Sequence, residues 1–131
     1  MIERYTLPEM GAIWSEENKY RKWLEVEIAV CEAWARLGQI PKSSLANIKK
    51  KANFDVKRIE EIEKVVKHDV IAFLTSVAEF VGEDSRFIHM GLTSYDIVDT
   101  SLSLLMVQSL DLVEKKLLEL RKIVKKMALK Y

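Results

Sequence analysis

Apolar residues recur at every third or fourth position over most of this chain, which is the periodicity of amphipathic helices. The first long stretch runs from Ser15 to about Leu37 and has a serine suited to the N-cap, two glutamates in its first turn and Gly38 just after its end. Its apolar stripe contains Trp23, Val26, Val30 and Trp34, with Leu24, Ile28 and Cys31 beside it. A stripe this wide predicts a helix that packs against two neighbours.

Three shorter helices are predicted next, beginning near Pro41, Asp55 and Asp69. The first extends to about Lys51, and the last ends at Gly82. The residues spaced to face a core are Ile59, Ile62 and Val66 in the second of these helices, and Val70, Phe73, Leu74, Val77 and Phe80 in the third. Residues 83–92 are the least periodic part of the chain, and we expect them to form an ordered loop.

The last predicted helix is much longer than the others. It begins at a cap on Thr93 or Ser94, and no Pro or Gly interrupts it before Tyr131. At 1.5 Å per residue its length is about 55 Å, which exceeds the width of a small domain. Its heptad positions, called here the apolar seam, are Met106, Leu110, Val113, Leu117, Leu120, Val124 and Met127. The preceding short helices cannot cover this seam, so the pattern predicts partner helices from other chains or from further sequence.

Composition narrows the fold class to all-α. The 131 residues are 49% hydrophobic and 31% charged, and they include only four Gly and two Pro, too few for the turns of an all-β fold. We expect a helical N-terminal domain over residues 1–92, followed by the start of a long-helix bundle over residues 93–131. Because 21 basic residues balance 20 acidic ones, no overall charge favours nucleic acid or an anionic membrane.

The remaining global features favour a cytoplasmic location. Cys31 is the only cysteine and has no partner for an intramolecular disulfide. No apolar run approaches the ~20 residues that span a bilayer, and the first residues lack the layout of a signal peptide.

Candidate chemistry lies in three short polar groups, because the sequence has neither a Gly-rich phosphate loop nor the spacing of a zinc site. The groups are Arg4 with Tyr5; Lys67, His68 and Asp69; and Thr93 with Ser94. Arginine and tyrosine suit a phosphate, histidine beside an acid suits proton transfer, and two hydroxyls at a helix N-terminus suit an anion.

Each group also has a purely structural interpretation. Arg4 and Tyr5 could belong to an N-terminal tail packed against the domain. His68 could be a surface residue, with Asp69 capping the next helix, and either Thr93 or Ser94 could be an ordinary N-cap. His89 and Cys31 are interpreted as core residues. Residues alone therefore indicate an anion-binding helical protein, and no particular reaction follows from them.

Taken in order along the chain, these groups resemble the N-terminal part of the adenylosuccinate lyase family, within the fumarase/aspartase superfamily. The segments that carry the resemblance are Ile2-Glu3-Arg4-Tyr5, Pro8-Glu9-Met10, Tyr20-Arg21-Lys22-Trp23-Leu24-Glu25-Val26-Glu27, Lys67-His68-Asp69-Val70, Gly82-Glu83-Asp84-Ser85 and Gly91-Leu92-Thr93-Ser94-Tyr95-Asp96. The resemblance implies a homotetramer whose subunits share a central helical bundle. It also implies elimination of fumarate from adenylosuccinate and from the succinylated aminoimidazole carboxamide ribotide of purine synthesis, without a metal or organic cofactor.

The resemblance assigns roles to the three groups. Arg4 and Tyr5 would bind the nucleotide, most plausibly its phosphate. Lys67, His68 and Asp69 would line the site, with His68 as an auxiliary catalytic or phosphate-binding residue, and Thr93 with Ser94 would hold a succinyl carboxylate. The family's catalytic histidine and serine lie in Thr-His-Gly and Ser-Ser-x-Met-Pro motifs, which these 131 residues lack. We therefore expect the chain to be an N-terminal fragment that is inactive alone.

Two other interpretations remain open at this point. One is a stand-alone helical module that dimerises through the apolar seam and catalyses nothing. The other is a different fumarate-releasing lyase of the superfamily, for example one acting on argininosuccinate or aspartate.

Overall fold

The computed structural model describes residues 2–131, and in this part of the chain only helices and short turns are present. In chain order the elements are η1 (Glu3–Tyr5), α1 (Pro8–Ile13), α2 (Glu16–Arg36), α3 (Lys42–Lys51), α4 (Val56–Val66), α5 (Asp69–Val81), η2 (Gly82–Phe87) and α6 (Ser94–Lys130), where η marks a 3-10 helix. The prediction of an all-α fold is confirmed.

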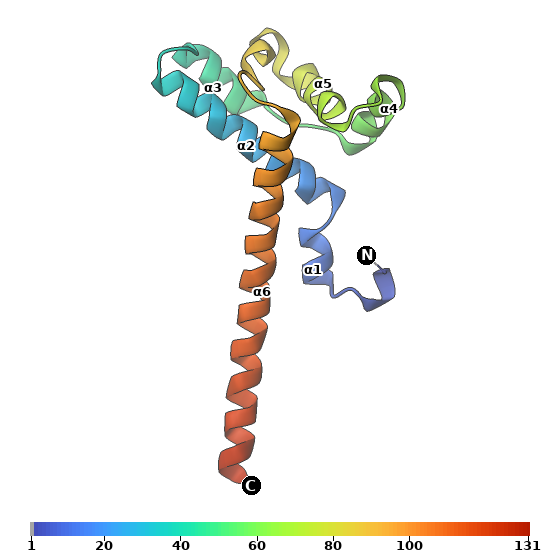
Figure 1. The fold of residues 1–131 in the computed structure, drawn as a ribbon, viewed down its shortest axis with the longest axis vertical. Helices are drawn as coiled ribbons and strands as arrows, with labels where there is room; N and C mark the ends of the chain where they lie inside the picture. Colours follow the sequence, from blue (N-terminus) through green and yellow to red (C-terminus); the bar gives the residue numbers. More distant parts are fainter. Residues whose placement is uncertain (1) are drawn as a thin grey trace.

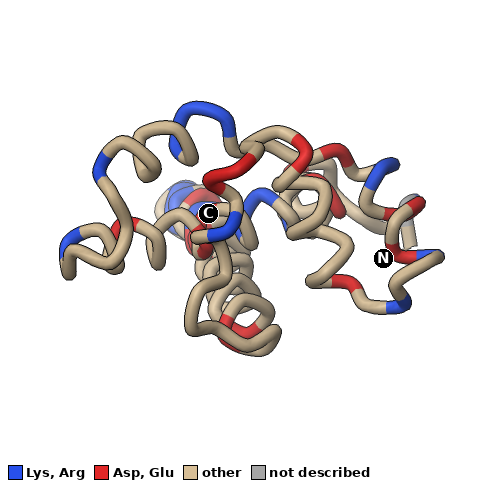
Figure 2. Tube along the Cα trace, turned by 90° about the horizontal axis from the view of Figure 1, so that it is seen from above, with Lys and Arg blue, Asp and Glu red and all other residues tan. Residues whose placement is uncertain are grey.

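The molecule has the outline of a T (Figure 1). Helices α2 to α5 lie across one end of α6, and α6 extends far beyond them to the C-terminus. Helix α1 lies beside the upper part of α6 and contacts it. Seen from above, basic and acidic segments are interspersed over helices α2 to α5 (Figure 2).

Most helix ends are fixed by the residues that the sequence indicates. Ser15 caps α2 by accepting the Asn18 N–H at 3.2 Å, and Asp55 caps α4 by accepting the Arg58 N–H at 3.1 Å. Gly38 follows α2 with a φ of 77°, a left-handed conformation that glycine adopts without steric cost.

Two local predictions are corrected by the structure, and one helix was not predicted. Helix α5 is capped by His68, and Asp69 is its first residue. Part of the expected loop after Gly82 is the 3-10 helix η2. Helix α1 was not predicted, although its first residue, Pro8, is followed by an acidic residue, a common helix start.

The hydrophobic core is centred on Phe73 of α5, which is fully buried. Its ring stacks on Tyr20 at a centroid distance of 5.7 Å and meets Trp23 edge-on at 5.5 Å, while Phe54 lies at 6.0 Å. Aromatic pairs at these distances add directional attraction to the burial of apolar area.

Two residues predicted to face the core are exposed. Val66 and Phe80 are 40% and 42% exposed. Each lies in the last turn of its helix.

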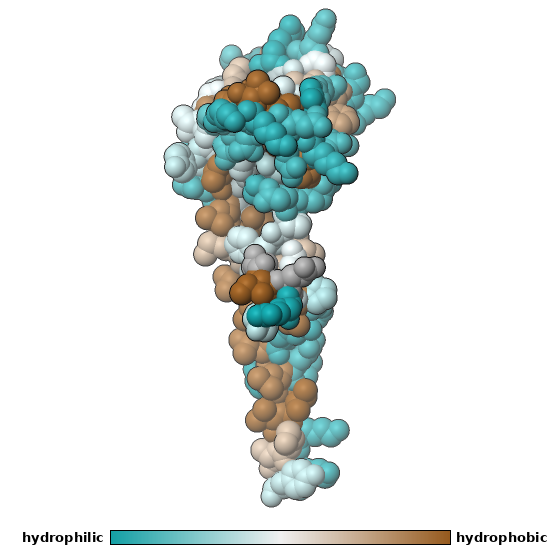
Figure 3. All heavy atoms as spheres, turned by 90° about the vertical axis from the view of Figure 1, so that its right-hand side faces the viewer, coloured by the Kyte–Doolittle hydropathy of each residue, from teal (hydrophilic) through white to brown (hydrophobic). Residues whose placement is uncertain are grey.

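The first turns of α6 pack on α2, and the following turns contact α1, with an ion pair between Lys116 and Glu9 at 3.4 Å. From Leu117 onward, no hydrogen bond or ion pair among residues 2–131 joins α6 to another helix. Ile97, Ser101 and Leu105 are buried, and every residue of the apolar seam is exposed. Figure 3 shows hydrophobic side chains along one side of this extended part and hydrophilic ones along another. None of the helices in the described residues combines the length and apolar character that a membrane crossing requires.

Candidate functional site

The N-terminus of α6 offers one free hydroxyl and the positive end of a long helix. The Asp96 carboxylate accepts the Thr93 N–H at 2.7 Å and the Thr93 hydroxyl at 3.0 Å. These two bonds lower the pKa of the Asp96 carboxyl. The Ser94 hydroxyl has no hydrogen-bond partner within residues 2–131, so it is available to a ligand. N–H groups of the first helical turn lack partners inside the helix, so an anion at Ser94 would meet further donors.

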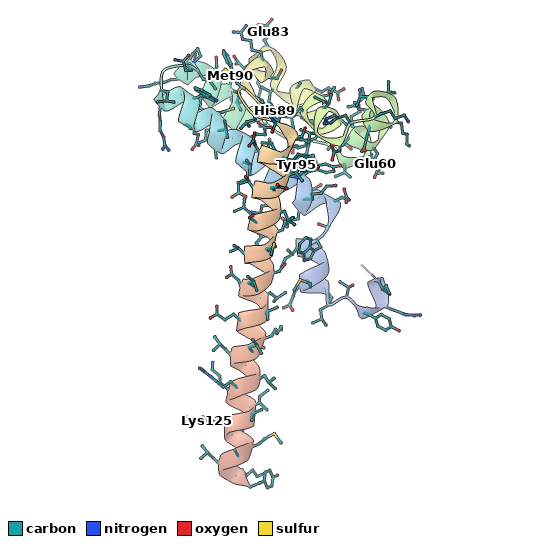
Figure 4. The ribbon with its side chains drawn as sticks, viewed as in Figure 1. Glu60, Glu83, His89, Met90, Tyr95 and Lys125 are labelled. Atoms are coloured by element: carbon teal, nitrogen blue, oxygen red, sulfur yellow. The ribbon has the colours of Figure 1, made fainter. Side chains whose placement is uncertain are left out.

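The turn before α6 is held against α2 by three α2 side chains spaced at three or four residues. Glu27 binds His89, the Cys31 thiol donates to the carbonyl oxygen of Phe87 at 3.7 Å, and the Trp34 indole N–H donates to the carbonyl oxygen of Met90 at 2.8 Å. Figure 4 shows His89 and Met90 where helices α2 to α5 meet the start of α6. One face of α2 therefore anchors residues 87–90.

Glu27 and His89 form a buried pair at the centre of this contact. One carboxylate oxygen, Oε2, accepts the His89 N–H at 2.9 Å, and the other, Oε1, lies 2.6 Å from the ring atom Nδ1. The Glu27 side chain is 1% exposed. Burial raises the pKa of the Glu27 carboxyl, and its bonds with His89 act in the opposite direction. The pKa of the neighbouring Cys31 thiol is raised to about 11, chiefly by burial.

The second predicted group lies at the junction of α4 and α5. Lys67 has a left-handed φ of 55° and ends α4. The Nδ1 atom of His68 accepts the Ile71 N–H at 3.4 Å and lies 3.5 Å from Asp69 Oδ1. The same nitrogen can therefore cap α5 when it carries a lone pair, or pair with Asp69 when it is protonated.

The first predicted group is exposed. Tyr5 is 74% exposed, and the Arg4 guanidinium carbon lies 4.8 Å from the centre of its ring. Both residues lie in η1 near α1. The structural interpretation of this group, an N-terminal tail packed against the domain, therefore does not apply to these two side chains.

The structure does not bring the three predicted groups together within one chain. No hydrogen bond or ion pair among residues 2–131 joins two of them. Lys67 lines a groove of about 500 Å³ formed by α4, whereas Asp96, two residues after Ser94, lines a separate groove of about 530 Å³ between α2 and α6. Within the described residues there is also no cluster of three or more His, Cys, Asp or Glu suited to a metal ion.

Sequence reasoning missed Glu27. A signal was present, because Glu27 lies four residues after Trp23 and four before Cys31, on the apolar stripe of α2. A charged residue in such a stripe predicts a buried partner. His89 was interpreted as a core residue. It is hydrogen-bonded to Glu27, but its side chain is 19% exposed and lies outside the core.

The sequence profile of a protein family described as lyase matches residues 3–131. This chain belongs to that lyase family. The match includes all three predicted polar groups and the whole of α6, so the described fold is the fold of a lyase segment.

Among curated relatives, this lyase chain is similar to several adenylosuccinate lyases. It is 52% identical to that of Aquifex aeolicus over 100% of this chain, 60% identical to that of Synechocystis over 89%, and 52% identical to that of Bacillus subtilis over 98%. The chain spans 27–31% of the length of these relatives.

Two solved structures of enzymes with different names have a similar fold over this segment. A fumarate lyase from Mesorhizobium aligns over 86% of this chain with a TM-score of 0.78 and 26% identity. A 3-carboxy-cis,cis-muconate lactonizing enzyme from Pseudomonas putida aligns over 85% with a TM-score of 0.76 and 27% identity. This chain covers 27% of each of those chains.

Proposed function

We propose that this chain is the N-terminal part of an adenylosuccinate lyase, which eliminates fumarate from adenylosuccinate to give AMP and from the succinylated aminoimidazole carboxamide ribotide in purine biosynthesis. The observation that carries the proposal is the 52–60% identity to adenylosuccinate lyases over 89–100% of this chain. The fold alone does not choose the reaction, because the two structural neighbours have similar TM-scores but are named for different activities.

In this proposal the three polar groups bind different parts of one substrate. Arg4 and Tyr5 contact the nucleotide phosphate, and Lys67, His68 and Asp69 line the site. Thr93 and Ser94 hold a succinyl carboxylate, Ser94 as the hydroxyl donor and Thr93 by fixing the helix end through its bonds with Asp96. The free Ser94 hydroxyl and the positive end of α6 support the last role, because a carboxylate there meets donors whose charge complements its own.

The separation of the groups supports a site built from more than one subunit. Residues of one chain that do not meet can still surround a single ligand when copies of the chain pack together. The exposed apolar seam supplies a surface for such packing, and we propose a cytoplasmic homotetramer. In the proposed elimination a base removes a proton from the carbon beside a succinyl carboxylate, the C–N bond breaks as the C=C bond of fumarate forms, and an acid protonates the leaving nitrogen. These steps need neither a metal nor an organic cofactor.

The test is fumarate release by the complete gene product that contains this chain. We expect release from adenylosuccinate, and none from argininosuccinate or aspartate. The 131-residue chain alone should show no turnover, and an antibody against it should detect a native product several-fold heavier than 15.2 kDa. Release from argininosuccinate or aspartate instead would assign the chain to another lyase. A native product of 15.2 kDa would favour the stand-alone helical module.

A further inference from the structure

Glu27 is a buried acid to which neither the sequence pattern nor the resemblance assigns a role. Its side chain is 1% exposed, whereas most of the other acidic side chains on α2 are exposed and form ion pairs along the helix or with α3. A buried carboxylate with its polar partner contributes little net stability compared with apolar residues of the same volume. Stability alone therefore does not account for an ionisable group at this position, and its contacts indicate a geometric role.

The backbone that Glu27 binds has an unusual conformation. His89 has a φ of 67°, one of only two positive values at non-glycine residues in the described chain, and Gly91 follows with a φ of 76°. A side chain larger than glycine adopts this region at a cost, so surrounding contacts must hold it there. Both oxygens of Glu27 contact His89, one through the backbone N–H and one through the ring.

The held turn leads directly into the candidate ligand site. The Leu92 N–H donates to the His89 carbonyl oxygen at 3.3 Å, and Thr93, the N-cap of α6, comes next. On the other side, the indole of Trp34 lies where a Cβ on Gly91 would approach to 3.2 Å, so the turn is packed closely against α2. A displacement of His89 would therefore move Thr93 and Ser94 relative to α2.

We propose that Glu27 is a positioning residue, whose buried carboxylate fixes the backbone and ring of His89 and thereby sets the location of Thr93 and Ser94 at the N-terminus of α6. Its kinetic consequence rests on the proposed function, in which these two residues hold a carboxylate of the substrate. Its structural consequence does not depend on any activity.

The decisive variant is Glu27→Gln, which keeps the size of the side chain. The glutamine oxygen can still accept the His89 N–H, but its NH2 group then faces the ring and donates where the carboxylate accepted. The neutral ring should therefore move its proton from Nδ1 to Nε2, which the 15N shifts of the imidazole report. Glu32→Gln on the same helix is the matched control, because Glu32 pairs with Lys49 at 2.6 Å, away from the turn.

Kinetics of the complete gene product test the positioning. We expect Glu27→Gln to lower kcat/KM by about tenfold or more, with a raised KM, since a small misplacement of binding groups has effects of this size. Glu32→Gln should leave both constants unchanged, and Glu27→Asp, which keeps the charge on a shorter chain, should recover part of the loss. A Glu27→Gln enzyme with unchanged kcat and KM would overturn the proposal, as would an unchanged ring tautomer.

Amide exchange in the 131-residue chain separates this proposal from the proposed function. Glu27→Gln should accelerate exchange at His89 and Leu92, while the core amides of α5 keep their protection. If the wild-type gene product released no fumarate from adenylosuccinate, the proposed function would fail, and exchange at the turn would decide the role of Glu27. Unchanged exchange at both amides would then overturn the role, and accelerated exchange would support it. Glu27→Ala, which removes both contacts, should give a larger acceleration wherever it folds.

Discussion

The Asp96 carboxylate accepts two hydrogen bonds from Thr93, one from its backbone N–H and one from its hydroxyl. The Thr93 hydroxyl is therefore committed to the helix end, whereas the Ser94 hydroxyl is free within the described residues. In the proposed site, Ser94 and the backbone N–H groups of the first turn are the donors that a substrate carboxylate can use.

The Thr93–Asp96 contact predicts a specific loss of stability in acid. Because the Thr93 bonds lower the pKa of Asp96 below its ordinary value of 3.8, the ionised carboxyl stabilises the folded chain above that value. This contribution is lost as the pH falls through the lowered pKa. Urea unfolding from about pH 5 to about pH 2 should show a shallower decline for Asp96→Asn than for wild type. Asp99→Asn, one turn further along α6, is the control and should follow wild type.

Capping and chemistry at His68 can be separated by two substitutions. His68→Ala removes the acceptor for the Ile71 N–H and should lower the free energy of unfolding by about 0.5 kcal/mol, since the bond is long. His68→Asn supplies a good N-cap and should retain stability. In the complete gene product both variants should lose fumarate-releasing activity if His68 serves the reaction.

The cap of α4 provides the comparison for His68. Asp55→Ala should lower the melting temperature without changing kcat or KM, because the one hydrogen bond that the Asp55 side chain makes within the described residues is with the Arg58 N–H at the helix start. Full activity in His68→Asn would contradict a catalytic or binding role for His68 and leave only its capping role.

Two phenylalanines of α5 differ in burial and should differ in their effect on stability. Phe73→Ala should lower the free energy of unfolding by about 3–5 kcal/mol, because it opens a cavity between Tyr20, Trp23 and Phe54. Phe80 is 42% exposed, and Phe80→Ala should cost less than about 1 kcal/mol. Urea denaturation of the two variants measures both values, and equal losses would contradict the described position of the core.

The apolar seam predicts self-association of the chain. Leu110 and Leu117 are 63% and 59% exposed, and leaving such a row in water is unfavourable. Sedimentation should show oligomers of wild type and a shift toward monomer for Leu110→Lys combined with Leu117→Lys. Lys115→Glu, on the opposite side of the helix, should leave the association unchanged. A wild-type chain that stays monomeric at all concentrations would refute the seam as an interface.

Local sequence signals predicted most of the helices well. Ser15, Asp55 and Gly38 act where they were expected, because capping depends on residues close together in the chain. The N-cap of α5 was predicted at Asp69, whereas the structure has it at His68. The two residues are adjacent, and the side chain of each accepts a backbone N–H in the first turn of α5. The division of the chain after residue 92, like the roles of the three polar groups, stays a prediction.

By itself, the sequence determined the all-α class, the long α6 and its unpartnered seam, because helical periodicity and capping are properties of neighbouring residues. Only the tertiary structure decided that Glu27 binds His89, 62 positions further along the chain. That contact depends on the packing of α2 against the start of α6, which no local pattern specifies. The tertiary structure also decided that Val66 and Phe80 stay exposed, since burial depends on which helix covers each side of a stripe.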